Sequence, residues 1–139
     1  MPPSLTITLD IAPVPFSRPR FNKGRGFNAP KYASFKAKAG WLMRAKFRKP
    51  AHLTPIGVHM IFAIVRPPTI KRPYPSVKPD GDNLVKAIFD AGNKILWEDD
   101  ALIVFHSALK IYADKPTITI EISEFDRVVE KRNGVWYVD

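Results

Sequence analysis

Apolar and polar residues alternate in two segments, one near each end of the chain. In residues 4–11, Leu5, Ile7 and Leu9 fall on one face, whereas threonines and an aspartate fall on the other. Residues 117–123 (TITIEIS) alternate in the same way. A period of two residues is typical of a strand with one buried face. Residues 56–65 and 101–112 are further apolar, β-prone runs, so the pattern predicts four strands.

Two other segments repeat their apolar residues at the spacing of an amphipathic helix. In residues 31–49, which are bounded by two prolines, the stripe includes Phe35, Ala39 and Met43, and lysines and arginines fill much of the remaining surface. In residues 82–96, large apolar residues recur every three or four positions. The pattern therefore predicts two helices.

The remaining segments contain residues that favour turns. Residues 12–30 contain prolines and glycines, and residues 66–79 contain five prolines. These residues are unfavourable in helices and interior strands, so both segments are predicted loops. Asn133-Gly134 lies between two β-prone runs, which is typical of a tight hairpin turn. The predicted fold is α+β, a single domain over residues 1–139 with the order β-α-β-α-β-β. In it, two helices pack on a mixed sheet, and residues 125–139 form a C-terminal β-hairpin extension.

Composition excludes several classes of protein. The chain has 139 residues and no cysteine, which excludes disulfide frameworks, thiolate zinc sites and cysteine nucleophiles. Its longest apolar run, residues 60–65, is too short to span a bilayer. The N-terminal segment lacks the basic and apolar regions of a secretory signal. We therefore expect a cytoplasmic protein with no membrane partner.

Charge divides the chain into two parts of opposite sign. The net charge is +9, but it is unevenly distributed. Residues 1–79 contain fifteen lysines and arginines and one acidic residue, whereas residues 80–139 contain seven lysines and arginines and twelve acidic residues. Such asymmetry favours a nucleic acid bound by the first part, and a solvated basic surface is the alternative. Phenylalanines interleaved with the cations of the first loop, among them Phe16, are expected to pack that loop on the core. The candidate DNA-binding residues are Arg18, Arg20, Lys23, Arg25, Lys36, Lys71, Arg72 and Lys78.

Acidic residues concentrate in residues 79–100, PDGDNLVKAIFDAGNKILWEDD. Five aspartates and one glutamate lie in this segment, in clusters on both sides of the second predicted helix. Crowded carboxylates repel one another unless a cation or a proton intervenes, and magnesium is held by one or two carboxylates together with substrate phosphate. The stretch therefore favours a hard-cation site. An EF-hand is excluded because Val85 and Ala91 occupy the positions of its glycine and its last acid, and the histidines show no zinc-ligand spacing.

Taken singly, several of these acidic residues also have a structural explanation. Asp82 lies where a helix N-cap belongs, so its carboxylate can accept backbone N–H bonds. Asp82, Lys86 and Asp90 are spaced four residues apart and can form ion pairs along one helical face. These explanations leave out Asp80 and the second cluster, which contains Asp99 and Asp100.

The run DGDNLVKAIFDAGNKILWEDDALIV resembles the signature of the RusA family of Holliday junction resolvases. That signature reads D-x-D-N-L-x-K, continues with F-D-A, and has W-x-D-D before a strand. The Pro/Arg-rich loop after the first strand and the late I-T-I-E-I strand are similar in order, so the resemblance covers residues 4–124. The segment AGNKIL and the C-terminal hairpin at residues 127–139 depart from the family pattern.

The resemblance implies a magnesium-dependent endonuclease, with manganese as a substitute metal, that acts as a homodimer on four-way DNA junctions. It also implies a prokaryotic or phage origin. The alternatives are a non-catalytic nucleic-acid-binding module and a nuclease for other branched DNA. A helix of the predicted length spans roughly 20 Å, so the two acidic clusters meet only if the chain folds back or a partner chain closes the site. By resemblance, the catalytic and metal-binding carboxylates are Asp80, Asp82 and Asp100, the catalytic lysine is Lys86, and Asp90 and Asp99 are secondary metal ligands.

Overall fold

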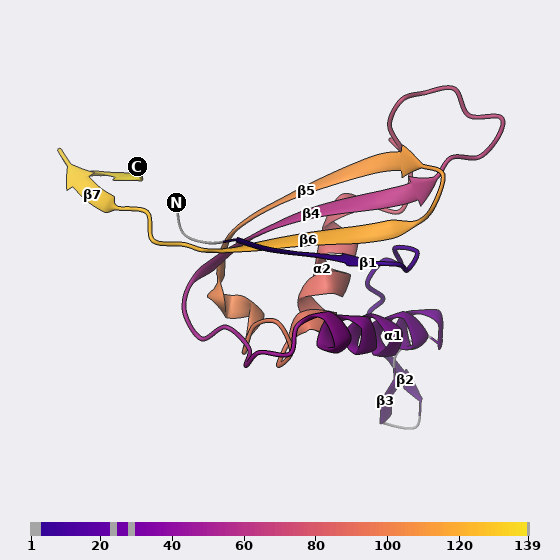
Figure 1. Cartoon of the computed structure of the whole chain (residues 1–139), viewed down its shortest axis with the longest axis horizontal. Coiled ribbons are helices and arrows are strands. Elements are labelled where there is room, and N and C mark those ends of the chain that lie inside the picture. The colour runs from indigo at the N-terminus through magenta and orange to yellow at the C-terminus, as the bar shows by residue number, and fades with distance from the viewer. Residues whose placement is uncertain (1–3, 23–24, 28–29, 139) are drawn as a thin grey trace.

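The computed structural model describes residues 4–22, 25–27 and 30–138, and it confirms the predicted α+β architecture (Figure 1). A four-stranded mixed sheet packs against two helices. The elements of this main body are β1 (Ser4–Leu9), α1 (Pro30–Lys46), β4 (Ile56–Val65), α2 (Gly81–Gly92), the 3-10 helix η1 (Asp100–Leu102), β5 (Ile103–Ala113) and β6 (Thr117–Glu124). Two small hairpins complete the fold: β2 (Arg20–Asn22) with β3 (Arg25–Phe27), and β7 (Val129–Arg132) with β8 (Val135–Val138).

The strand order of the main sheet is β1-β6-β4-β5. β4 and β5 run parallel, so the chain must cross over between them, and α2 lies in that crossover. β6 follows β5 after a short turn and inserts between β1 and β4, antiparallel to both. The sheet is therefore a βαβ unit extended by two antiparallel strands, with β1 and β5 at its edges.

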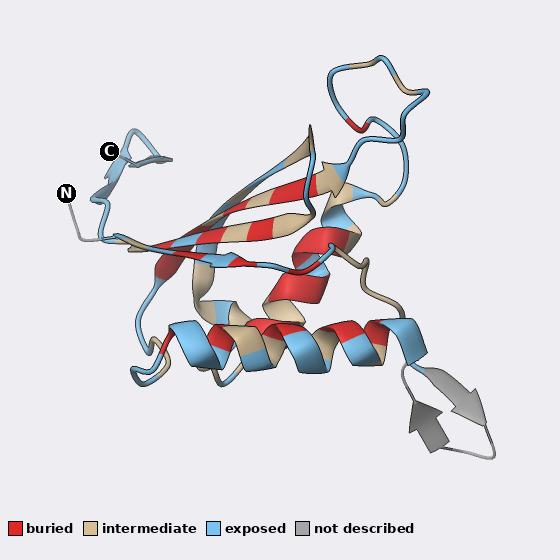
Figure 2. Ribbon diagram, turned by 45° about the vertical axis from the view of Figure 1, so that its right-hand side comes forward, coloured by how far each residue is buried: buried red, intermediate tan, exposed pale blue. Residues whose placement is uncertain are grey.

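Both helices cover the same face of this sheet (Figures 1 and 2). The covered face is built from alternate strand residues, as the two-residue period predicts; in β4 the buried series runs from Ile56 to Phe62. Leu84 and Ile88 of α2 are fully buried in the same core, together with Trp97. This packing fixes α2, the helix that lies between the two acidic clusters in the chain.

Several predicted boundaries are wrong, each for a local reason. α1 ends at Lys46 and not at residue 49; Lys49 directly precedes Pro50, a position that is disfavoured in a helix. α2 ends at Gly92 and not at residue 96, because the backbone of Lys94 turns to a left-handed φ of 69° and directs the chain back toward Gly92. The third predicted strand begins two residues late, after the turn formed by η1, and the first strand ends at Leu9.

The predicted loop over residues 12–30 contains a short hairpin, β2–β3, that its proline and glycine content did not indicate. The expectation that Phe16 packs the loop on the core is confirmed. Its ring lies edge-on against Tyr32 with centroids 5.3 Å apart, and its backbone N–H donates to the Asn83 carbonyl at 2.8 Å. The loop is thereby attached to both α1 and α2.

The C-terminal hairpin is confirmed. Asn133 and Gly134 connect β7 to β8 with φ values of 51° and 78°, the positive values that a tight hairpin turn requires. Residues 66–79 form a loop without helix or strand, as predicted. In the part of the chain that the structure describes, no helix is long and apolar enough to cross a membrane.

Candidate active site

The first acidic cluster, which we define as Asp80 and Asp82, lies at the start of α2. Asp80 is the N-cap residue, and its carbonyl accepts from the N–H of Leu84 at 3.2 Å, but its carboxylate makes no capping bond. Asp82 follows in the first turn, and both side chains are exposed. The prediction that Asp82 caps the helix is therefore wrong, since Asp80 occupies that position. Neither carboxylate is used to build the helix end.

The predicted ion pairs along α2 are also wrong. Lys86 is exposed and pairs with neither Asp82 nor Asp90 in the described part of the chain. Asp90 is bound instead by α1: the Tyr32 hydroxyl donates to its Oδ2 at 2.5 Å, and Lys36 Nζ lies 3.3 Å from the same oxygen. Burial, followed by the hydrogen bond and the charge of Asp90, raises the pKa of Tyr32 far above its ordinary value. Asp90 thus joins the two helices, and Lys86 has no ion-pair partner among the described residues.

The second acidic cluster, Asp99 and Asp100, lies beyond the other end of α2. The Asp99 carboxylate accepts from the backbone N–H of Ala101 at 2.9 Å and caps η1. Partial burial raises the pKa of the Asp100 carboxyl, and the hydrogen bond and charge of Asp99 add to this effect, while a hydrogen bond with Asn93 opposes it. The charge of Asp90 raises the same pKa further. Asp90 and Asn93 therefore lie near this cluster.

The two clusters are far apart within one chain. The twelve residues of α2 extend about 18 Å. β5 runs back along the helix, and Lys110 Nζ donates to the carbonyls of Val77 (2.9 Å) and Pro79 (3.0 Å), directly before Asp80. Asp100 precedes β5 and so lies beyond the opposite end of that strand, whose first residue, Ile103, is roughly 23 Å of extended chain from Lys110. No three aspartate, glutamate or histidine side chains among the described residues are grouped closely enough to hold a metal.

The predicted DNA-binding residues fall into three groups. Arg18, Lys71 and Lys78 are exposed, and Lys78 lies two residues before the first acidic cluster. Lys36 is half-buried in its ion pair with Asp90, and Arg72 is half-buried in the loop. Lys23 lies outside the described residues, as do the side chains of Arg20 and Arg25, whose backbones belong to β2 and β3.

Two residues of this region were not indicated by the sequence patterns. Lys110 joins β5 to the end of the basic loop, and Asn93 lies near Asp100 and accepts from the Trp97 indole N–H at 3.1 Å. Lys110 could have been noticed in the sequence, because it is a lysine inside a largely apolar predicted strand. Asn93 carried no comparable signal, because its role depends on the turn that ends α2.

Comparison with known proteins identifies the chain's relatives. Residues 10–123 match the family described as Endodeoxyribonuclease RusA. YqaN of Bacillus subtilis (strain 168), which is described only as an uncharacterized protein, is 38% identical over 50 residues. That segment is 36% of this chain and 35% of YqaN, so the match spans about a third of the relative's length. The family match covers most of the chain and includes both acidic clusters and Lys86, and the chain therefore belongs to the RusA endodeoxyribonuclease family.

Proposed function

We propose that this chain is a magnesium-dependent, structure-specific endodeoxyribonuclease that resolves Holliday junctions. The observation that carries the proposal is the first acidic cluster in a member of the RusA family. Asp80 and Asp82 are exposed at the start of a well-packed helix, with no capping bond and no ion pair among the described residues. Unpaired carboxylates fixed on a rigid element, in a chain of net charge +9, are suited to bind a cation beside a polyanion.

The donor set of the first cluster fits magnesium. Magnesium takes oxygen ligands, keeps several waters and is commonly held by one or two carboxylates together with substrate phosphate. Asp80 and Asp82 supply two such carboxylates, and Asp100 is the third proposed ligand. When bound, the metal lowers the pKa of a water and neutralises charge on the scissile phosphate. Asp90 is held by Tyr32 and Lys36, and Asp99 caps η1, so positioning roles suit both better than ligand roles.

Lys86 is the proposed electrostatic catalyst. It lies one turn beyond Asp82 on α2, exposed and unpaired with the acids of its own helix. Its ammonium can donate to a phosphate oxygen and stabilise the negative charge that develops in the transition state. Lys71 and Lys78 are exposed on the loop that leads into Asp80, and their ammonium groups are proposed to bind neighbouring phosphates. Such contacts read the shape of branched DNA and not its sequence.

A homodimer would complete this site. The second acidic cluster lies at the wrong end of α2 to join Asp80 within one chain, and a four-way junction has near two-fold symmetry that matches a symmetric dimer. β5 supports pairing of two copies, because it is an edge strand of eleven residues on which Phe105 and Leu109 are 49% and 45% exposed. In the proposed dimer, Asp100 of one copy faces Asp80 and Asp82 of the other.

The first test is a cleavage gel with three substrates: a four-way junction, a fork and a linear duplex, each with magnesium, manganese or a chelator. Asp82→Asn removes one charge without changing shape, so junction cleavage should be lost while binding in chelator persists. Asp114→Asn, an exposed position in the β5–β6 turn, is the matched control and should cleave like the wild type. Undiminished cleavage by Asp82→Asn would refute the assigned site. If the wild type binds the junction without cleaving it, the chain is a non-catalytic nucleic-acid-binding module. If it cleaves forks alone, it is a nuclease whose substrate is the fork and not the four-way junction.

A second test asks whether the site is shared between two chains. Asp82→Asn and Asp100→Asn are each expected to be inactive as purified homodimers. In a mixed dimer with shared sites, both substitutions fall in one site and leave the other intact. Co-refolding the two variants should therefore restore nicking of the junction. If each site is built within one chain, the mixed dimer contains two defective sites and stays inactive.

A further inference from the structure

The outward surface of α1 carries an exposed tryptophan. Trp41 is 83% exposed and lies off the stripe of Phe35, Ala39 and Met43 that packs α1 on the core. Single exposed apolar residues are ordinary on protein surfaces. Tryptophan is a large aromatic ring with a polar N–H, however, and it is enriched where proteins bind their partners. The residues around Trp41 therefore distinguish an ordinary exposed side chain from one that binds a partner.

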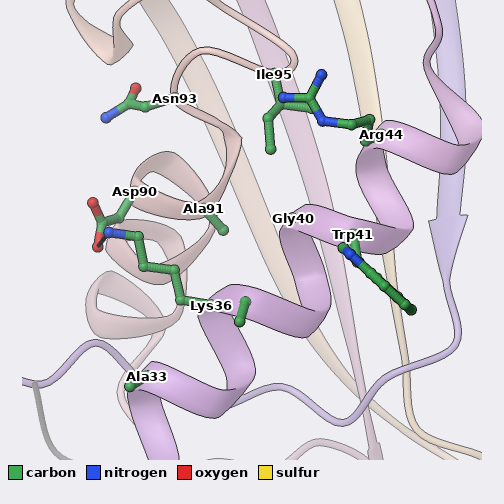
Figure 3. Close-up of a pocket in the computed structure, with 10 residues that line it drawn as sticks. Ala33, Lys36, Gly40, Trp41, Arg44, Asp90, Ala91, Asn93 and Ile95 are labelled. Carbon is green, nitrogen blue, oxygen red and sulfur yellow. Dashed lines mark ion pairs between the residues drawn. The ribbon is translucent and has the colours of Figure 1, made fainter.

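Two grooves meet at Trp41. One, of about 540 Å³, lies between α1 and α2 and extends to Asn93 (Figure 3). The other, of about 620 Å³, continues past Arg48 and Lys49. Trp41 and Arg44 border both grooves, and in Figure 3 the indole ring points away from α2. The ring is thus accessible in the middle of a continuous surface.

Beyond Trp41 the two grooves contain ion pairs, Lys36 with Asp90 and Lys94 with Glu98, whereas the other cations beside the ring are unpaired among the described residues. α1 contains no acidic residue, and Arg44, Arg48 and Lys49 form no ion pair within the described ranges. An aromatic ring between cations is the arrangement by which proteins hold single-stranded nucleic acid, because the cations bind phosphates while a base stacks on the ring. An acidic protein would use the cations but not the ring, and an intact duplex hides the faces of its bases. The surface therefore suits a strand with an exposed base.

We propose that Trp41 is a stacking platform for an unpaired base of the DNA substrate and that Arg44 binds the adjoining phosphates. A branch point is where bases lose a stacking neighbour, and Asn93, which lines the first groove, lies near Asp100. A strand held on Trp41 would accordingly run toward the second acidic cluster. The inference rests on the proposed function only in taking branched DNA as the substrate. Stacking of a single strand on Trp41 does not depend on the proposed function, because it requires no cleavage.

The test is binding of a fluorescent twelve-nucleotide oligothymidine, measured by anisotropy in chelator so that no cleavage occurs. Trp41→Ala should weaken binding by roughly 5- to 100-fold, and Trp41→Phe should retain most of it. Trp136→Ala removes another exposed tryptophan, 64% exposed on β8, and should bind like the wild type. The slope of the logarithm of the binding constant against the logarithm of the salt concentration should be unchanged in Trp41→Ala, which removes no charge. In Arg44→Gln the slope should become shallower by about one, because one phosphate contact is lost.

Fluorescence provides a second readout. The chain has three tryptophans, and Trp97 is fully buried. In a Trp136→Phe background, Trp41 is then the one solvent-accessible tryptophan, so oligothymidine should quench its emission at the concentrations that raise the anisotropy. Circular dichroism of Trp41→Ala should match the wild type, because the side chain it removes lies outside the core.

Three results would overturn the inference. Unchanged binding by Trp41→Ala would show that no base stacks on the ring, and an equal loss in Trp136→Ala would show that the effect is not specific to this surface. A lower mass of Trp41→Ala by light scattering without DNA would assign the residue to a contact between copies. These outcomes are independent of the cleavage test, since a failure of Asp82→Asn to abolish cleavage leaves binding in chelator unaffected.

Discussion

Gly92, the last residue of α2, lies against Trp97, the largest fully buried side chain among the described residues. A Cβ on Gly92 would be 2.5 Å from Cζ2, 2.9 Å from Cε2 and 3.0 Å from Cη2 of Trp97. Carbon atoms pack at about 3.5–4.0 Å, so Gly92→Ala forces a movement. The ring is not free to yield, because its N–H donates to Asn93 Oδ1 at 3.1 Å and to the Phe89 carbonyl at 3.3 Å. The Trp97 carbonyl also accepts from the backbone N–H of Lys94 at 2.7 Å.

The expected destabilisation combines two opposing effects. Overpacking of a core typically costs about 1–3 kcal/mol, and replacement of glycine by alanine in a helix contributes up to about 1 kcal/mol of stability. The obstacle is a buried ring and not the end of a flexible side chain, so the upper part of the overpacking range applies. We expect Gly92→Ala to lower the free energy of unfolding by about 2 kcal/mol. For a chain of this length that corresponds to a fall in Tm of roughly 6–10 °C.

Urea unfolding followed by near-ultraviolet circular dichroism measures this change and reports on the Trp97 environment. Gly81→Ala is the matched control, since a Cβ at that first position of α2 meets nothing within 4 Å. It should stay within about 0.5 kcal/mol of the wild type. Equal unfolding midpoints for the two variants would refute the contact between Gly92 and Trp97. The turn that carries Asn93 and leads to Asp100 would then need a different explanation.

Three further predictions concern the packing that holds α2. Tyr32→Phe removes the hydrogen bond to Asp90 and should cost about 1.5–3 kcal/mol in urea unfolding; a loss below about 0.5 kcal/mol would mean that the bond contributes little. The pKa of Tyr32 is raised in the folded state by burial and by Asp90, so the stability that this tyrosine contributes is present below about pH 10 and is lost as pH rises above it. The difference between wild type and Tyr32→Phe should therefore shrink at higher pH, by up to about 1.4 kcal/mol per pH unit, and a constant difference would contradict the assignment. Ile88→Ala leaves a cavity at a fully buried position and should cost about 2–5 kcal/mol, whereas Val135→Ala on the exposed hairpin should change stability by less than about 0.5 kcal/mol; similar costs for both would be inconsistent with the core.

Periodicity predicted the main elements because it reports burial directly. Alternate residues of β4 and β6 are buried, and the apolar stripe of α2 packs on them, so the order of four strands and two helices followed from the sequence. The pairing of β6 between β1 and β4 did not follow, because strand order depends on contacts between segments more than fifty residues apart. The short β2–β3 hairpin lay in a segment whose prolines and glycines argued against strands.

The acidic stretch illustrates a second limit of sequence patterns. Spacing rules consider one helix at a time, and they paired Asp90 with Lys86. The structure pairs it with Tyr32 and Lys36, which lie on α1 more than fifty residues earlier. The N-cap was likewise predicted at Asp82, whereas the structure has it at Asp80, two residues earlier. Residue types therefore indicated a candidate site, whereas tertiary contacts decided which carboxylates are used for packing and which stay exposed.

The rigidity of α2 determines how Asp100 can contribute. Leu84 and Ile88 hold the helix in the core, so the two acidic clusters cannot approach each other without loss of that packing. Asp100 then either completes the site of a second copy or has no part in metal binding. The two cases differ in one measurement. If the site is shared, Asp100→Asn abolishes cleavage and is rescued by co-refolding with Asp82→Asn. If Asp100 has no such part, Asp100→Asn alone cleaves like the wild type, and Asp80 and Asp82 with the DNA phosphate are the complete set of ligands.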